Sequence, residues 1–335
     1  KRQVKVDPSE QDYWRMMALT KFEDEIWRRS SNFDDARGPV DSSTDASVLT
    51  RSVIQEITIA SLGNIYLPAA YEVSDVRDNG GIELEYEVAT GALVVARGLD
   101  SVPRGFTYTV ASAVPDFDPA ALPVSAAAGL GGGFVAEHTQ LPPTCGPGET
   151  AADDGCWPSS VTDLALTITA GATTDHERVL ALQNHFLNPA NFTYDLEVAL
   201  QHDVRDIEDF LFVTRRGYCE QFAATFAAMA RSLGIPARVA VGFTWGDWDA
   251  DRGVYAVRGE HAHAWPEVYF ADTGWVVFDP TPGRSRPHDG DVTGLTAPAQ
   301  PGDGPTLPPV TDTGPAPEPT TGPGDTPGRS DPAEA

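Results

Sequence analysis

Cys219 is a cysteine at the predicted start of a helix, in the stretch RRGYCEQFAATFAAMARSLGIPARV. Apolar residues repeat here at the spacing of one helical face: Phe222, Phe226, Met229, Ala230 and Leu233. Gly234 and Pro236, just beyond them, predict where the helix ends. The N–H groups at a helix N-terminus favour a thiolate and can donate to an oxyanion that forms nearby. Cys219 is therefore a candidate nucleophile, with a buried structural cysteine as the alternative.

A cysteine nucleophile needs a base, and the stretch GEHAHAWPEVYF offers two histidines. In an extended strand His261, His263, Trp265, Glu267 and Tyr269 share one face. Ordinary surface histidines on a polar edge strand are one alternative, and a metal-binding pair is another. A third ligand of comparable quality is not apparent, and zinc sites need three or four protein ligands. We therefore predict no metal and no cofactor.

Asp279 supplies a third group, at the end of the apolar run in GWVVFDPTP. An acidic residue in that position can hold a histidine in one tautomer and orientation. The turn signal between Ala271 and Gly274 makes the two flanking strands neighbours, so His263 and Asp279 can face each other. An aspartate that simply ends a strand before Pro280 is the alternative.

The region that holds these residues has helices first and strands after them, which predicts an α+β domain over residues 161–286. VTDLALTITAG is predicted as one helix, and the next begins after Thr174, with Glu177 completing a capping box. Beyond the cysteine helix come ARVAVGF, GVYAV, HAWPEVYF and GWVVFD, which are rich in β-forming residues. We expect them to form one antiparallel sheet.

Residues 1–125 are predicted to form a separate β-rich domain. Between Val53 and Val110, short runs alternate between apolar and polar residues and are bounded by turn residues, with a strong turn signal at 78–81. This pattern indicates an antiparallel, sandwich-like arrangement. The segment 13–27 is ambiguous, because its apolar residues fit one helical face only imperfectly.

Residues 126–160 are rich in Gly and Pro and are predicted to connect the two domains. They contain Cys145 and Cys156, for which we expect a disulfide in an oxidising compartment; two free loop thiols are the alternative. If these two residues pair, Cys219 remains the odd thiol of the chain.

Composition also limits the function. Residues 287–335 are acidic and rich in Pro and Gly, which predicts a disordered linker. The net charge of −26 argues against nucleic-acid binding. Apolar runs of about 18 residues are absent, so we predict no transmembrane helix in this sequence.

The stretch 247–251 is similar to the start of a calcium loop, but Arg258 stands at the position where such a loop has its closing acidic residue. A solvated hairpin tip is therefore favoured.

The stretches around Cys219, His263 and Asp279 resemble the transglutaminase-like superfamily in their order and spacing. RRGYCEQFAATFAAMARSLGIPARVAVGF resembles its nucleophile helix and the strand that follows, HAWPEVYF its histidine strand, and GWVVFDPTP its aspartate strand. The resemblance covers about residues 160–285. Further upstream, YWRMMALTKFEDEIW and IYLPAAYE resemble the extracellular portion of bacterial membrane-anchored transglutaminase-core proteins.

The resemblance implies a papain-like core, with the nucleophile helix packed on an antiparallel sheet. It also implies that this sequence is a segment of a longer protein, held at the extracellular face of the plasma membrane by helices outside the segment.

The roles implied by the resemblance are nucleophile for Cys219, general acid and base for His263, and orienting group for Asp279. His263 is preferred to His261 because the family histidine directly precedes Ala-Trp. The implied reaction is acyl transfer from an amide of a protein or peptide substrate, through a thioester that a primary amine or water resolves. A cysteine peptidase or amidase and a non-catalytic binding module are the alternatives. Tyr218 and Trp265 are candidates to line the acyl pocket or to pack in the core.

Overall fold

The computed structural model describes residues 2–6, 10, 12–23, 26–28, 32–40, 50–96, 99–118, 122–146, 155–198 and 207–283, all within one compact unit. The predicted linker over residues 287–335 lies outside these ranges. Within the described ranges, no helix combines the length and the apolar character that crossing a membrane requires.

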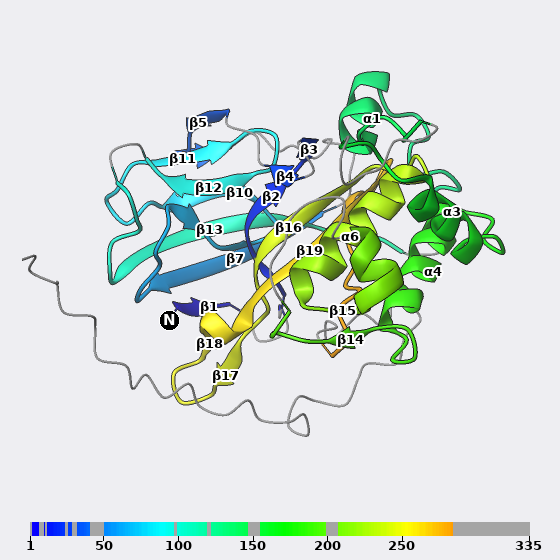
Figure 1. Ribbon diagram of the computed structural model, residues 1–335. Coiled ribbons are helices and arrows are strands. Elements are labelled where there is room, and N and C mark those ends of the chain that lie inside the picture. The colour runs from blue at the N-terminus through cyan, green and yellow to red at the C-terminus, as the bar shows by residue number, and fades with distance from the viewer. Residues whose placement is uncertain are drawn as a thin grey trace, which may run out of the picture. The chain divides into compact units, whose positions relative to one another are not determined.

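A five-stranded antiparallel sheet carries the candidate residues, in the order β20-β19-β16-β2-β9. Its strands are β2 (Trp14–Leu19), β9 (Ala69–Ala70), β16 (Ala237–Phe243), β19 (Ala262–Phe270) and β20 (Gly274–Val277). The long helix α6 (Cys219–Ser232) packs against β16 and β19 (Figure 1). Helices α3 (Ser159–Ile168) and α4 (Asp175–Leu187) pack against each other and against α6. The fold is thus α+β, as predicted.

A seven-stranded antiparallel sheet forms the second layer of strands, in the order β17-β18-β1-β7-β13-β10-β6. Its strands are β1 (Arg2–Lys5), β6 (Gly38–Pro39), β7 (Thr50–Ile59), β10 (Glu72–Asp78), β13 (Phe106–Pro115), β17 (Asp247–Asp249) and β18 (Val254–Val257). In β7 the buried residues Val53, Ile57 and Ile59 alternate with more exposed neighbours, which is the period of a strand with one face in the core. The predicted N-terminal antiparallel β structure is confirmed.

Shorter elements complete the described chain. A four-stranded sheet has the order β5-β11-β12-β8. The remaining bounds are β3 (Lys21–Glu23), β4 (Ile26–Arg28), β5 (Phe33–Asp35), β8 (Tyr66–Leu67), β11 (Leu84–Glu87), β12 (Ala92–Val95), α1 (Gly132–Thr139), β14 (Thr193–Tyr194), η2 (Asp209–Thr214), β15 (Arg216–Gly217) and η3 (Gly259–His261).

Each of the two large sheets contains strands from both the N-terminal and the C-terminal parts of the described chain. β2 and β9, from the first 70 residues, extend the sheet of the candidate site, whereas β17 and β18, which follow α6, extend the seven-stranded sheet. The expectation that GVYAV lies in the same antiparallel sheet as ARVAVGF, HAWPEVYF and GWVVFD is therefore wrong: its residues form β18, which pairs with β1 and β17. The physical reason is that β16 already pairs with β19 and β2, and β19 with β16 and β20, so neither strand has a free edge for β18.

The ambiguous segment 13–27 contains strands and no helix in its described part. Residues 14–19 form a strand because β2 pairs with β16, which provides hydrogen-bond partners for its backbone. Local periodicity does not reveal such a partner. Gly242 permits the close approach: a Cβ there would lie 2.1 Å from the carbonyl oxygen of Trp14. The N-terminal segment is thereby built into the sheet of the candidate site.

Four buried charges tie the two large sheets together. Glu267 on β19 accepts hydrogen bonds from Arg238 Nε at 2.6 Å and from Arg15 Nη1 at 3.3 Å. Arg238 also lies 3.6 Å from Glu72, which belongs to the seven-stranded sheet. All four side chains are almost completely buried. Burial opposes ionisation of Glu267, but the two arginines outweigh it and hold its pKa below 4.5.

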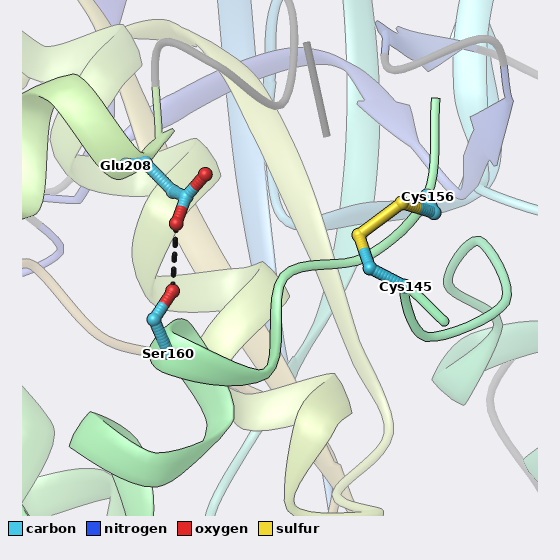
Figure 2. Close-up of a disulfide and its surroundings, with 4 residues drawn as sticks. All are labelled: Cys145, Cys156, Ser160 and Glu208. Carbon is cyan, nitrogen blue, oxygen red and sulfur yellow. Dashed lines mark hydrogen bonds between the residues drawn. A yellow bond between two sulfur atoms is a disulfide. The ribbon is translucent and has the colours of Figure 1, made fainter. Parts of the chain in front are cut away.

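Cys145 and Cys156 form a disulfide, and Figure 2 shows it close to the start of α3. In the same view Ser160 of α3 donates to Glu208 Oε1 at 2.7 Å, which ties α3 to the residue before η2. The disulfide therefore lies beside a helix that packs on α6.

Replacing Cys145 and Cys156 together by serine is expected to lower the free energy of unfolding by about 3 kcal/mol, because the loop between them is no longer closed in the unfolded chain. Urea denaturation measures the change. Reducing the wild-type disulfide is the matching control and should produce the same loss; equal stability of all three samples would contradict the prediction.

Candidate active site

Cys219 is the first residue of α6, at the expected helix start. The backbone N–H of Tyr218, which precedes the helix, donates to Gln221 Oε1 at 3.0 Å and fixes the first turn. The apolar face of the helix is fully buried at Phe222 and Phe226. Beyond the helix Gly234 has a φ of 77°, the left-handed conformation that commonly follows a helix end. This anchoring holds the thiol at a fixed place over the sheet.

His263 and Asp279 form a buried pair. His263 is the second residue of β19, and its Nε2 lies 2.8 Å from Asp279 Oδ2. Asp279 follows β20, which pairs with β19 through the predicted turn. The Asp279 backbone N–H donates to Gln183 Oε1 of α4 at 2.8 Å, and the backbone N–H of Thr281 donates to Asp279 Oδ1 at 3.0 Å. The carboxylate is therefore held from several sides.

The thiol of Cys219 completes the group. Burial disfavours the charged imidazole of His263, but Asp279 and Cys219 outweigh this effect and raise the pKa of His263 to about 9. Asp279 occupies Nε2, so the buried Nδ1 is the ring atom left for the thiol, and it has no nitrogen or oxygen partner among the described residues. The three side chains can thus pass a proton between sulfur and imidazole while Asp279 balances the charge.

The charged His263 also stabilises the fold, and the sign of its pH dependence follows from its pKa. Because the pKa is raised from 6.5 to about 9, the stabilisation is fully present below pH 6.5 and is lost as the pH rises through 9. We expect the melting temperature of the wild type to fall by several degrees between pH 7 and 9.5, and that of His263→Gln to fall less.

His138→Gln is the matched control for this measurement. His138 is also buried, and burial lowers its pKa to about 4, so its titration lies outside the window. The variant should retain the wild-type fall. A wild-type melting temperature that stays constant from pH 7 to 9.5 would contradict the prediction.

Tyr218 and Trp265 have different surroundings. Tyr218 is partly exposed beside Cys219; burial and the charges of Glu220 and Cys219 raise its pKa to about 12. Trp265 is only 1% exposed and packs against Tyr13 with ring centroids 4.8 Å apart. Trp265 therefore presents no surface to a substrate, whereas Tyr218 lies where a substrate could reach it.

His261 belongs to a surface ion-pair cluster rather than to the buried group. The ligand atoms of Asp247, Glu260 and His261 lie within 4.8 Å of one another, but Arg258 contacts both carboxylates. His261 Nδ1 accepts from the Arg258 backbone N–H at 3.0 Å, so the neutral ring carries its proton on Nε2, the nitrogen that faces Asp247. A cation would have to displace Arg258 and reverse this tautomer, so the residues do not fit a metal. The stretch 247–251 belongs to a hairpin, but the predicted tip is shifted: Asp247–Asp249 form β17 and the turn follows at 250–253.

Tyr13 is a member of the site that the sequence analysis missed. Its hydroxyl donates to Asp279 Oδ2 at 2.5 Å, and the two residues are 266 positions apart. The Tyr13 ring lies edge-on to that of His263, with 5.5 Å between the ring centroids, and Tyr13 is 2% exposed. A local signal for this contact does not exist, because it depends on the pairing of β2 with β16.

Comparisons with known proteins show which families and chains this chain is similar to. The Transglutaminase-like superfamily matches residues 162–280, and the TgpA N-terminal domain matches residues 2–119. The uncharacterized protein YebA of Bacillus subtilis is 36% identical over 140 residues, which are 39% of this chain and 19% of YebA. A protein-glutamine gamma-glutamyltransferase of Pseudomonas aeruginosa is 40% identical over 75 residues, 22% of this chain and 11% of that protein. The chain thus matches less than a fifth of the length of these curated relatives.

Two crystal structures of the periplasmic domain of TgpA from Pseudomonas aeruginosa have the same fold. One superimposes with a TM-score of 0.60 at 22% identity and covers 88% of both chains. The other, bound to ethylmercury, gives a TM-score of 0.58 at 22% identity and covers 83% of this chain and 88% of that one. The chain therefore combines a transglutaminase-like core with a TgpA N-terminal domain, in the fold of the TgpA periplasmic domain.

Proposed function

We propose that the chain catalyses cysteine-dependent acyl transfer on a protein substrate. Cys219 is the nucleophile, His263 the general acid and base, and Asp279 the residue that orients His263. The observation that carries this proposal is the buried His263–Asp279 pair, 2.8 Å apart, beside a free thiol in the first turn of a helix. The resemblance of the whole core to transglutaminases supports the same roles.

The first half-reaction breaks an amide. The Cys219 thiolate attacks the carbonyl carbon of a glutamine side chain, a C–S bond forms, and the oxygen becomes an oxyanion. N–H groups at the start of α6 can donate to that oxygen. When the C–N bond breaks, the imidazolium of His263 gives its Nδ1 proton to the departing nitrogen, which leaves as ammonia. With a pKa of about 9, the imidazolium carries that proton at neutral pH.

The second half-reaction resolves the thioester. Neutral His263 takes a proton from an incoming primary amine, whose nitrogen attacks the thioester carbonyl, and Cys219 leaves as a thiolate. An amine on a second protein gives an isopeptide crosslink, whereas water gives a carboxylic acid. The similarity to the glutamyltransferase of Pseudomonas aeruginosa supports the amine as acceptor. A cysteine peptidase or amidase would use the same three residues with water.

We also propose that the reaction takes place outside the cytoplasm, on protein or peptide substrates of the cell envelope. The disulfide between Cys145 and Cys156 supports an oxidising compartment. The similarity in fold to a periplasmic domain supports the same location. In this proposal, helices outside the present segment anchor the protein at the extracellular face of the plasma membrane.

The test is incubation with a glutamine-rich, lysine-blocked protein and a fluorescent primary amine, with ammonia release measured in parallel. We expect equal amounts of ammonia released and amine incorporated, and loss of both in His263→Gln. His261→Gln is the matched control: it alters the neighbouring histidine, which lies in the surface ion-pair cluster, and should retain activity.

The outcomes separate the candidate functions. Ammonia without amine incorporation would favour an amidase, and new peptide termini would favour a peptidase. A chain that forms no thioester and releases neither product, with every amine and glutamine substrate tried, would overturn the proposal.

A further inference from the structure

We propose that Tyr13 is a positioning residue for His263, and that it acts through the carboxylate of Asp279. The inference rests on the proposed triad and deepens it. It assigns a role in catalysis to the N-terminal part of the chain, which lies outside the matched transglutaminase-like core of residues 162–280.

Asp279 Oδ2 is shared between two donors. The Tyr13 hydroxyl donates to it at 2.5 Å, and His263 Nε2 lies 2.8 Å from the same atom. The other carboxylate oxygen, Oδ1, accepts from the backbone N–H of Thr281. Since the oxygen that balances the charge of His263 also accepts from Tyr13, the tyrosine hydroxyl controls how much negative charge faces the imidazole.

The ring of Tyr13 forms part of the wall around His263. It lies edge-on to the imidazole, packs against Trp265 at 4.8 Å, and stacks on Trp245 with an interplanar angle of 9°. With an exposed fraction of 2%, Tyr13 excludes water from this side of the pair. Low local polarity strengthens the interaction between Asp279 and His263.

The backbone around Tyr13 fixes its direction. The Tyr13 backbone N–H donates to Asp12 Oδ1 at 2.7 Å, and the indole N–H of the next residue, Trp14, donates to the carbonyl oxygen of Trp245 at 2.9 Å. Pairing of β2 with β16 leaves only β16 between Tyr13, the residue before β2, and the histidine strand β19, and the tyrosine ring spans this separation to reach His263. Tyr13 is thus held by its neighbours independently of its own hydroxyl.

Tyr13→Phe removes the hydroxyl and keeps the ring. With one donor fewer, the carboxylate of Asp279 attracts the imidazolium more strongly, so the pKa of His263 should rise further, by about one pH unit. The imidazole also loses a restraint on its orientation. We therefore expect kcat to fall about tenfold with KM unchanged.

The experiment measures the ring titration of His263 by NMR of histidine-labelled protein, together with the kinetics of amine incorporation. Tyr108→Phe is the matched control: Tyr108 is also fully buried and donates at 2.5 Å, but to the carbonyl oxygen of Pro68 in another part of the fold. It should lose comparable stability without moving the His263 titration. Identical His263 titrations in Tyr13→Phe and the wild type would overturn the inference.

A second pair of variants tests the route through Asp279. In an Asp279→Asn background the carboxylate charge is absent, so adding Tyr13→Phe should not shift the His263 titration further. A further shift of the same size would mean that Tyr13 acts on His263 by ring contact alone, and would also overturn the inference. The titration needs no substrate, so it separates failure of this inference from failure of the proposed acyl transfer.

Discussion

Replacing Cys219 by alanine is expected to lower kcat for amine incorporation about ten-thousand-fold or more. The thioester cannot form without the sulfur, and His263 then has no nucleophile to serve. Cys219 is 8% exposed and is the first residue of a well-packed helix, so the smaller side chain of alanine should leave the fold intact. Amine incorporation and thermal unfolding, measured on the same preparation, check both statements.

Met229→Leu is the control for this substitution, because Met229 is fully buried on the same helix and has no part in the proposed chemistry. The chain also permits a chemical test. Its other two cysteines are joined in a disulfide, so iodoacetamide has one thiol to modify in the whole chain. Alkylation should add one adduct and abolish activity. Full activity in Cys219→Ala or after stoichiometric alkylation would exclude Cys219 as the nucleophile.

Glu267→Gln is expected to have the largest effect on stability, a loss of about 3–5 kcal/mol in the free energy of unfolding. The substitution removes the charge that Arg238 and Arg15 share and leaves Glu72, 3.6 Å from Arg238, as the remaining carboxylate beside the two buried guanidinium groups. Chemical denaturation measures the loss. In the wild type, the lowered pKa of Glu267 means that this stabilisation is present above pH 4.5 and is lost as the pH falls further.

Glu83→Gln is the matched control for Glu267→Gln. Glu83 pairs with Arg37 at 2.6 Å, but both side chains are more than 60% exposed. Solvent screening makes such a pair worth less than about 1 kcal/mol. If the two variants lost the same stability, the buried charge of Glu267 would not stabilise the fold as we infer.

Local signals in the sequence predicted the elements that carry the candidate site. The position of Cys219 follows from helical periodicity and a glycine stop, and the capping box at Thr174 and Glu177 is confirmed with a hydrogen bond of 3.1 Å. The order of His263 and Asp279 follows from one hairpin, whose two strands pair as expected. In each case the residues that determine the structure are near neighbours in the chain.

What could not be predicted depends on contacts between distant segments. β18 is as apolar as the strands of the site, but both edges of β16 are occupied and β18 pairs with β1 instead. The contact between Tyr13 and Asp279 could not be predicted for the same reason. The segment of Tyr13 fits a helix imperfectly, and Asp279 lies near the other end of the described chain. Local propensity is a weak guide when tertiary pairing decides the structure.

The exchange of strands between the two sheets limits how this protein can be recombined. A fragment that began at residue 162 would leave one edge of β16 unpaired, because β2 and β9 would be missing, and such an open edge invites aggregation. A fragment that ended at residue 119 would lose β17 and β18 from the seven-stranded sheet. The two matched segments, 2–119 and 162–280, therefore follow one another in the sequence, but each large sheet needs strands from both segments to complete its native strand order.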